Sequence, residues 1–508
     1  MSSSRVTVVA SEEQVQPQRR LHPLSWLFAL LSFMRQFVAP IIVAVFFGAR
    51  RDYELWGLLA AVPLLIGALW HQYFYRYGFG PRELIIREGI LFRNQRRIDF
   101  ARVVNIDTVR GPLHRLCNVA EVKIETSAGG KAEALIRVLG PQALQELRER
   151  VFGGQDAGAA GVADAHREAQ AAPIPLLHLP PGELVRFGLI DNRGVILAAA
   201  AAGTAFQMGL DEVMGRALMG ALPGAVDDVG NLAWPLQAAL ALAAILAALV
   251  LLRVLSIVLA LLTLYDFRLT RTGADLRVQY GLLTRVGLTL RQQRIQAVRE
   301  TETFLHRLLG RVSLQVDLAG DAQEGGEAQA DRMRWLAPVA TAAHAPQLIA
   351  SALPQFDPAA QPDWQPLAAG ARRRVFRRTA WVGSVLLLAP ALWFFAYPGV
   401  LVLLLTIPLA AFHARQYVRC TRWAITPEVL LFRQGWLTRR LVIAPRNRVQ
   451  SVELAESPFD RRHGMASVAI DAAGGSARAF LIRVPYLQHA TAQQLMGELY
   501  RQDPRPVM

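Results

Sequence analysis

The feature that most constrains this 508-residue chain is a threefold internal repeat. Three stretches aligned on Gly89, Gly281 and Gly435 stay in register for 36 positions without a gap. An arginine recurs 13 residues after each glycine, a second arginine 26 residues after it, and an acidic residue 36 residues after it. Self-similarity of this kind indicates duplication, so one structural unit must be built three times.

Each repeat has the pattern of short strands followed by a helix. Segments such as 83–92, 428–437 and 467–471 are short, rich in branched or aromatic residues and interrupted by glycine or polar turns, which is typical of β-strands. Leucines at helical spacing follow in 141–151 and 486–500, and 343–353 takes the same place in the second repeat. The pattern predicts, in each copy, an antiparallel sheet or small barrel closed by one C-terminal helix.

Long uncharged runs accompany the repeats and indicate a membrane protein. Only 19% of the residues are charged, against about 25% in soluble proteins. The run 55–75 has 21 residues without Asp, Glu, Lys or Arg, which fits a hydrocarbon core of roughly 30 Å. Similar runs near 26–48, at 194–210, at 229–252 and in 379–414, where Tyr397-Pro398-Gly399 makes a turn, complete six expected spans in three hairpins.

Charge predicts the orientation of these hairpins. Arginines flank the third hairpin on both sides, whereas its internal turn has no charge, so the positive-inside rule places both flanks in the cytoplasm. The loop 211–232 has a net charge of −3 and fits the outer side. The flanks of the first hairpin are ambiguous. Since each hairpin returns the chain to its starting side, all three polar segments should be cytoplasmic, and the absence of a cleavable signal pattern in the first 20 residues predicts that the first span stays as an anchor.

These patterns give an expected layout of the chain. It comprises a polar N-terminal tail at 1–25; transmembrane hairpins at 26–75, 186–265 and 379–416; repeat domains at 76–152, 266–353 and 417–502; a linker at 153–185; and a linker with a basic flank at 354–378.

Two segments of the third repeat, RNRVQSVEL (446–454) and RRHGMASVAIDAAGG (461–475), are similar to the signature of the bacterial membrane-flanked PH-like domain. ARVVNI and HRLCNVAEVKIETSAGG in the first repeat, and QRIQAV and HRLLGRVSLQVD in the second, stand at the same places. Three hairpin-plus-domain units resemble the YdbT-type membrane proteins over nearly the whole chain. The resemblance implies three α+β PH-like split-barrel domains and a location in the bacterial inner (plasma) membrane, but no chemistry. The second repeat departs most, because a polar insertion occupies 321–331.

The candidate ligand-binding residues are arginines of the repeats: Arg102, Arg294, Arg448, Arg115, Arg307, Arg461, Arg439 and Arg440. A guanidinium can bind phosphate or carboxylate through two hydrogen bonds, and a basic residue beside an anionic leaflet contributes about 1 kcal/mol. Each set also has a structural alternative. The first three could pair with Glu125, Asp317 and Asp471 of their own domain, the next three could order a loop, and the last two could act only as topology anchors.

Signatures of enzymes and of metal or nucleic-acid sites are missing from the sequence. Cys117 and Cys420 lie far apart and belong to no paired motif. No H-E-x-x-H or G-x-S-x-G motif occurs, and the position that His114 and His306 share in their repeats is occupied by Asp460 in the third. The net charge of +15 suits an anionic membrane surface, whereas the dispersed arginines lack interleaved aromatics for base stacking. We expect no catalysis, no cofactor, no metal and no nucleic-acid partner.

The sequence therefore predicts a non-catalytic binding or scaffolding platform for anionic lipid headgroups or for a protein in the membrane or cytoplasm. The alternative is an accessory component of a transport, export or resistance system whose hairpins form a pathway. Arg35 and Arg253 motivate this alternative, because an arginine inside a span is costly. The scarcity of other polar groups in the spans argues against it. The oligomeric state stays open.

Overall fold

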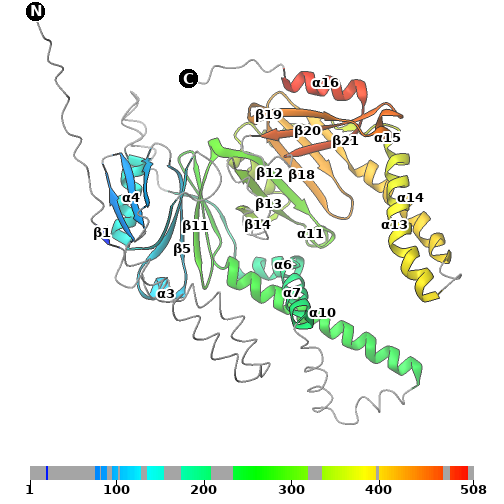
Figure 1. Cartoon of the computed structure of the whole chain (residues 1–508), viewed down its shortest axis with the longest axis horizontal. Helices are drawn as coiled ribbons and strands as arrows, with labels where there is room; N and C mark the ends of the chain where they lie inside the picture. The colour runs from blue at the N-terminus through cyan, green and yellow to red at the C-terminus, as the bar shows by residue number, and fades with distance from the viewer. Residues whose placement is uncertain are drawn as a thin grey trace, which may run out of the picture. The chain divides into compact units, whose positions relative to one another are not determined.

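The computed structural model describes residues 19–20, 75–80, 82–88, 94–100, 103–126, 134–153, 173–207, 233–318, 334–395, 400–472 and 481–500. The chain divides into two compact units, which are treated separately below (Figure 1). Unit 1 consists of residues 1–172 and 283–289, and unit 2 of residues 173–282 and 290–508.

Unit 1 contains the first repeat as two antiparallel meanders and a helix. The first meander is β2 (Arg76–Phe79), β3 (Glu83–Glu88) and β4 (Asn94–Asp99), with the short β1 (Arg19–Arg20) on β2. The second is β5 (Val103–Arg110), β6 (Ala120–Thr126) and β7 (Ala134–Leu139), with α3 (Pro112–Leu116) between β5 and β6. Helix α4 (Pro141–Gly153) buries Leu144, Leu147 and Val151 against side chains of both meanders. This helix confirms the expected C-terminal closure, because its apolar stripe covers the core.

Unit 2 contains the second and third repeats, each with the same order of elements. The second repeat has β9 (Arg268–Thr272), β10 (Asp275–Tyr280), β12 (Ile295–Glu302), α11 (Phe304–Leu309), β13 (Arg311–Leu318), β14 (Arg334–Thr341) and α12 (Ala345–Ala352). The third has β16 (Arg422–Ile425), β17 (Val429–Gln434), β18 (Arg439–Pro445), η6 (Arg446–Arg448), β19 (Val449–Ala455), α15 (Pro458–Arg461), β20 (Met465–Ala472), β21 (Ile482–Gln488) and α16 (His489–Tyr500).

The last helix begins later than the sequence pattern predicts. Leucine spacing suggested a helix from residue 486, but Leu487 belongs to β21, where it lies opposite Ala466 of β20. Its side chain is buried in the core of the third repeat. Sheet pairing therefore overrides the helical spacing at this point, and α16 starts at His489.

Strands of consecutive repeats pair with each other, which the sequence pattern of separate domains did not predict. In unit 1, residues 285–287 of β11 (Arg285–Arg291), a strand of the second repeat, pair with β5 of the first. In unit 2, β18 of the third repeat pairs with β12 of the second over five residues (Figure 1). The strands of a repeat are thus divided between two sheets, and one part continues into the next repeat.

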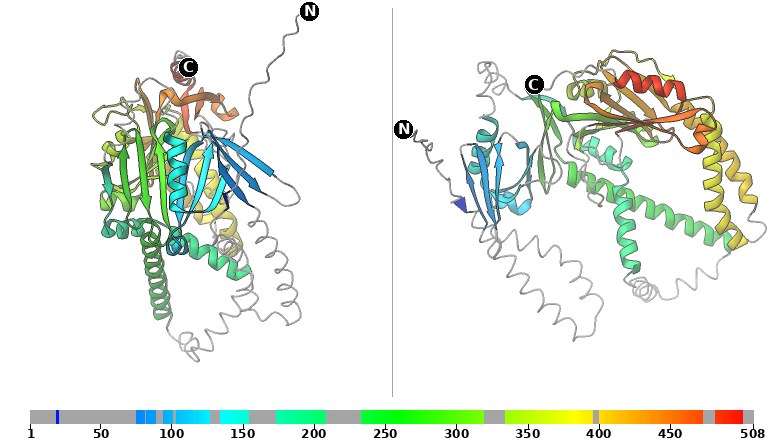
Figure 2. Two further views of the ribbon diagram at one scale, coloured as in Figure 1. Left: turned by 90° about the vertical axis from the view of Figure 1, so that its left-hand side faces the viewer. Right: turned by 45° about the horizontal axis from the view of Figure 1, so that its top comes forward.

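The membrane hairpins are described in part. Helix α10 (Trp234–Leu264) is, within the described ranges, the one helix long and apolar enough to cross a membrane. Helix α7 (Arg193–Gln207) contains a shorter apolar segment, Arg193–Thr204. Helices α13 (Ala371–Phe395) and α14 (Val402–Cys420) lie side by side at the third expected hairpin (Figures 1 and 2). The runs near 26–48 and at 55–75 lie outside the described residues, so the structure supports fewer spans than the six expected.

The second hairpin packs closely on α10 through glycines. A Cβ on Gly194 of α7 would lie 2.3 Å from Ser256 Oγ, and one on Gly188 of α6 (Pro181–Ile190) would lie 2.5 Å from the Ile257 Cα. The Gly194 amide also donates a hydrogen bond of 3.1 Å to Ser256 Oγ. Small residues at these points let the helix backbones approach each other, as in other membrane helix pairs.

Candidate functional site

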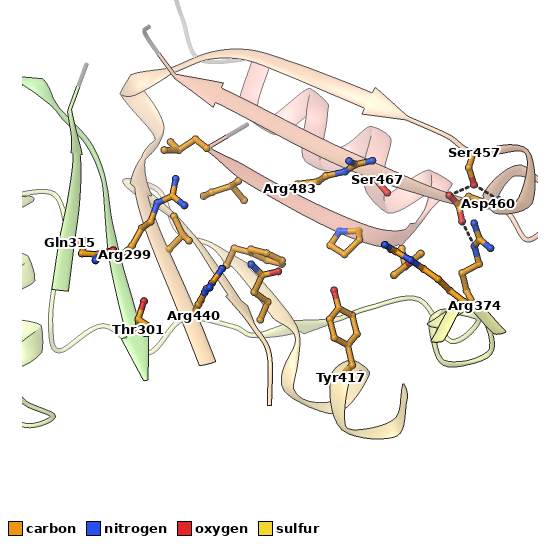
Figure 3. A pocket seen from close by; sticks show the side chains of 18 residues that line it. Arg299, Thr301, Gln315, Arg374, Tyr417, Arg440, Ser457, Asp460, Ser467 and Arg483 are labelled. Atoms are coloured by element: carbon orange, nitrogen blue, oxygen red, sulfur yellow. Dashed lines mark hydrogen bonds and ion pairs between the residues drawn. The ribbon is translucent and has the colours of Figure 1, made fainter. Parts of the chain in front are cut away.

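An open cavity of about 740 Å³ lies within unit 2, between the β12–β18 sheet and the β20–β21 hairpin (Figure 3). Helices α13 and α14 also contribute side chains to its lining. The cavity is basic, because a single carboxylate, Asp460, faces five arginines: Arg299, Arg374, Arg378, Arg440 and Arg483. Its hydroxyl and amide groups come from residues such as Thr301, Ser467 and Gln434.

Strand register places the arginines of the sheet on one face. Arg299 lies opposite Val442, and Thr301 lies opposite Arg440, in the β12–β18 pair. Residues directly opposite each other in antiparallel strands project to the same side, so all four line the cavity. The pairing of two repeats is therefore what brings Arg299 and Arg440 to one site.

Two of the five arginines are held by carboxylates. Arg374 contacts Asp460 through Nε at 3.2 Å, and its guanidinium lies 4.8 Å from the centre of the Phe459 ring. Asp460 also accepts a hydrogen bond from the Ser457 hydroxyl. Arg299 contacts Asp317 through Nε at 2.5 Å. These contacts fix the orientation of two cationic groups at the wall of the cavity.

The other three arginines have no carboxylate partner among the described residues. Arg378, Arg440 and Arg483 are all exposed, and they come from α13, β18 and β21 respectively. Figure 3 shows Arg440 and Arg483 on opposite sides of the space, with Tyr417 reaching in from α14. Uncompensated guanidinium groups around one space favour an anion with several oxygen acceptors.

A second groove of about 410 Å³ adjoins the basic cavity along the third hairpin. Arg378, Tyr417 and Tyr486 line both spaces, so the two are continuous. The rest of the groove is mainly apolar and includes Val375 and Val382 of α13. A charged space thus leads into an apolar one beside helices that the sequence assigns to the membrane.

The two adjacent arginines of β18 have different environments. Arg440 lines the cavity, whereas Arg439 points to the other face and contacts Glu302 of β12 at 3.4 Å. Of the eight arginines proposed from the sequence, Arg440 is the one that lines this cavity.

The second arginine of the repeats has a different setting in each copy. Arg307 donates hydrogen bonds to the Trp436 and Leu437 carbonyls, at 3.0 and 3.1 Å. This contact orders the turn of the following repeat. Arg115 and Arg461 lie exposed on α3 and α15, and Arg115 takes part in an interaction of its own.

The first arginine of the repeats lies away from the cavity in the copies that are described. Arg294 ends the short 3-10 helix η3 (Gln292–Arg294) and has an interaction partner. Arg448 ends η6, and burial lowers the pKa of its guanidinium. Arg102 lies outside the described residues. Whether any of these arginines binds a ligand stays a prediction.

His306 has a structural position. Thr303 caps α11, with its amide donating to His306 Nδ1 at 3.3 Å, while His306 Nε2 lies 2.8 Å from Ser313 Oγ. Burial lowers the pKa of this histidine to about 4. Ser457 and Asp460 form the corresponding cap in the third repeat. The shared sequence position is therefore a helix-capping position that either side chain can fill.

Sequence reasoning missed four arginines of the cavity: Arg299, Arg374, Arg378 and Arg483. A partial signal exists, since Arg299 and Thr301, like Arg440 and Val442, alternate along predicted strands. The alternation assigns each pair to one face, but the pairing of two different repeats is needed to bring the faces together. Within the described part of the chain, no cluster of His, Cys, Asp and Glu could hold a metal ion.

Comparisons with known proteins agree with the repeated architecture. The Bacterial PH domain family matches three stretches, residues 28–154, 220–343 and 379–503. The chain is 21% identical over 472 residues to the UPF0699 transmembrane protein YdbT of Bacillus subtilis (strain 168), covering 89% of this chain and 92% of the relative. No solved structure shows a significant match. The chain therefore belongs to the Bacterial PH domain family and is a membrane protein of the YdbT type.

Proposed function

We propose that the protein is a multi-pass inner-membrane platform whose three PH-like domains lie in the cytoplasm and bind ligands without catalysis. In the third repeat, the ligand is the phosphate-bearing headgroup of an anionic membrane lipid. The observation that carries this proposal is the basic cavity, where three exposed arginines without carboxylate partners among the described residues surround one space.

The charge of the cavity supports an anionic ligand. Two of its arginines are held in place through Asp317 and Asp460, which leaves Arg378, Arg440 and Arg483 to bind. Hydrogen bonds between guanidinium groups and phosphate are stronger than neutral ones, and they can form in pairs. A phosphate bound between β18 and β21 would also relieve the mutual repulsion of these arginines.

The adjoining groove supports a lipid over a soluble phosphate compound. A headgroup bound by Arg440 and Arg483 would place its glycerol near Tyr417 and Arg378, where the cavity meets the groove. The apolar side chains of α13 could then receive the start of an acyl chain. A free phosphate compound or an acidic peptide would have no use for this groove.

The transport alternative receives no added support from Arg253. This side chain donates from Nη1 to the Leu189 and Asp191 carbonyls and to Asn192 Oδ1, at 3.2, 3.3 and 3.1 Å. It therefore satisfies backbone groups at the end of α6, a favourable position for a cation because helix C-termini carry partial negative charge. Arg35 lies outside the described residues.

Lipid binding can be measured on the purified full-length protein in neutral detergent. Short-chain phosphatidylglycerol, short-chain phosphatidylcholine and inorganic phosphate are titrated separately by calorimetry. Binding should be strongest for phosphatidylglycerol, and Arg440→Ala or Arg483→Ala should weaken it roughly tenfold to a hundredfold, since a hydrogen bond to a charged group contributes about 1.5–3 kcal/mol.

Arg439→Ala is the matched control, because it removes the same charge from the neighbouring position but from the face that contacts Glu302. Its affinity for phosphatidylglycerol should stay close to that of the wild type. Equal losses in the Arg439 and Arg440 variants would reduce the effect to net charge and contradict a specific site. Equal affinity for phosphatidylcholine would contradict an anionic ligand.

A further inference from the structure

The two strand pairings between consecutive repeats share one register. Counting from the aligned glycines, Arg110 of β5 is at position 21 of the first repeat and lies opposite Arg285, at position 4 of the second. Glu302 of β12 is likewise at position 21 of the second repeat and lies opposite Arg439, at position 4 of the third. The pairing of one repeat with the next is therefore a repeated feature of this fold.

This rule leaves one strand of each type at the ends of the array. Strand β4 of the first repeat corresponds to β11 and β18, and β19 of the third repeat corresponds to β5 and β12. Among the described strands, β4 pairs with β3 alone, and β19 pairs with β20 alone. The chain thus ends in two complementary sheet edges, one from each type of pairing strand.

We infer that β19 of one chain pairs with β4 of a second copy, head to tail, in the register that joins the repeats within the chain. In this register Glu453 would lie opposite Arg96, and Ala455 opposite Asn94. The inference goes beyond the proposed lipid binding, because it uses another surface and would hold whatever fills the basic cavity.

Charge complementarity supports a second copy as the occupant. Glu453 is exposed on β19, while β4 presents exposed Arg96 and Arg97. The equivalent pairing inside the chain already contains an acidic and a basic residue in contact, Glu302 and Arg439. Charged side chains often protect a sheet edge from pairing, yet β18 starts with two arginines and is paired on both sides.

The second recurring arginine supports the same occupant. Arg307 holds the turn of the next repeat through the Trp436 and Leu437 carbonyls. Arg461 is its counterpart in the last repeat, where no further repeat follows in the chain. Its side chain is exposed and has no side-chain partner within the described residues. It is therefore available to hold a joining strand from another copy.

Head-to-tail pairing has a consequence for assembly. The two surfaces differ, so each added copy presents a fresh β4 or β19 edge. Such heterologous contacts produce rings when the rotation closes and filaments when it does not.

Cysteine cross-linking tests the register in the full-length protein. In a Cys117→Ser/Cys420→Ser background, one tagged chain carries Arg96→Cys and a second, differently tagged chain carries Glu453→Cys. Oxidation of the co-expressed pair should give a disulfide dimer containing both tags. Ser451→Cys is the control for Glu453→Cys, because it lies two residues along the same face, where the distance of about 7–8 Å exceeds disulfide range.

Charge reversal provides an independent measurement without cysteines. Arg96→Glu in one chain or Glu453→Arg in the other should reduce co-purification of the two tags, and the two changes together should restore it. Absence of the 96–453 disulfide dimer, or an equal yield of the 96–451 dimer, would overturn the proposed pairing. Loss of co-purification in both single variants without rescue in the combination would overturn the contact between Glu453 and Arg96.

Discussion

Acidification should loosen the second repeat around His306. The imidazole is buried, its Nδ1 accepts from the Thr303 amide, and its Nε2 lies 2.8 Å from Ser313 Oγ, which itself donates to the Pro338 carbonyl at 2.6 Å. The neutral form with the proton on Nε2 satisfies all these contacts. A second proton would place a charge in a site whose burial already lowers the pKa from 6.5 to about 4.

The direction and size of the effect follow from this difference in pKa. Below pH 6.5 the unfolded state binds the proton more readily than the folded state, so stability is complete above 6.5 and falls progressively until about pH 4. A pKa difference between 6.5 and about 4 corresponds to about 3 kcal/mol. The loss should be local at first, because a chain with several domains does not unfold in one step.

Hydrogen exchange of a peptide that covers β13 is a suitable local assay. His306→Gln keeps an acceptor and a donor but cannot take up a proton in this range, so it is the matched variant. It should be less protected than the wild type at pH 7.5, and the difference should shrink as the pH approaches 4.5. A difference that stays constant between these pH values would refute the assignment of a neutral, buried His306.

Two further predictions concern how the second hairpin packs on its domain. Glu183→Gln should lower the stability of α6 by about 1.5–3 kcal/mol, measured as faster exchange of α6 amides, because the carboxylate accepts two hydrogen bonds from Arg311 at 2.8 and 2.9 Å; unchanged exchange would contradict a stabilising pair. Gly194→Ala should lower the melting temperature through a clash with Ser256 that costs about 1–3 kcal/mol. Gly203→Ala on the same helix has no atom within 4 Å of the new methyl group and should not lower it; an equal drop in both variants would contradict the close approach.

The repeated unit and the nature of its elements were predictable from the sequence. The alignment on Gly89, Gly281 and Gly435 defines three copies, and branched residues bounded by turns indicate strands. The structure confirms β-rich repeats, each with a C-terminal helix such as α4 or α16. These features depend on local periodicity, which one sequence contains.

The cavity was not predictable, because it depends on which strands pair. Arg440 was a candidate through its position near the membrane, but its neighbour Arg439 had the same sequence signal. Pairing of β18 with β12 separates the two, turning one to the cavity and the other to Glu302. Arg483, from a hairpin more than 40 residues further along the chain, joins the site only through tertiary packing.

The most direct test of the proposed function is electron cryomicroscopy of the full-length protein in nanodiscs that contain phosphatidylglycerol. We predict density for a phosphate within hydrogen-bond distance of Arg440 and Arg483, with an acyl chain entering the groove beside Val375 and Val382 of α13. The same density should be absent from nanodiscs of phosphatidylcholine alone. A cavity without lipid density in the anionic nanodiscs would contradict the proposed lipid site.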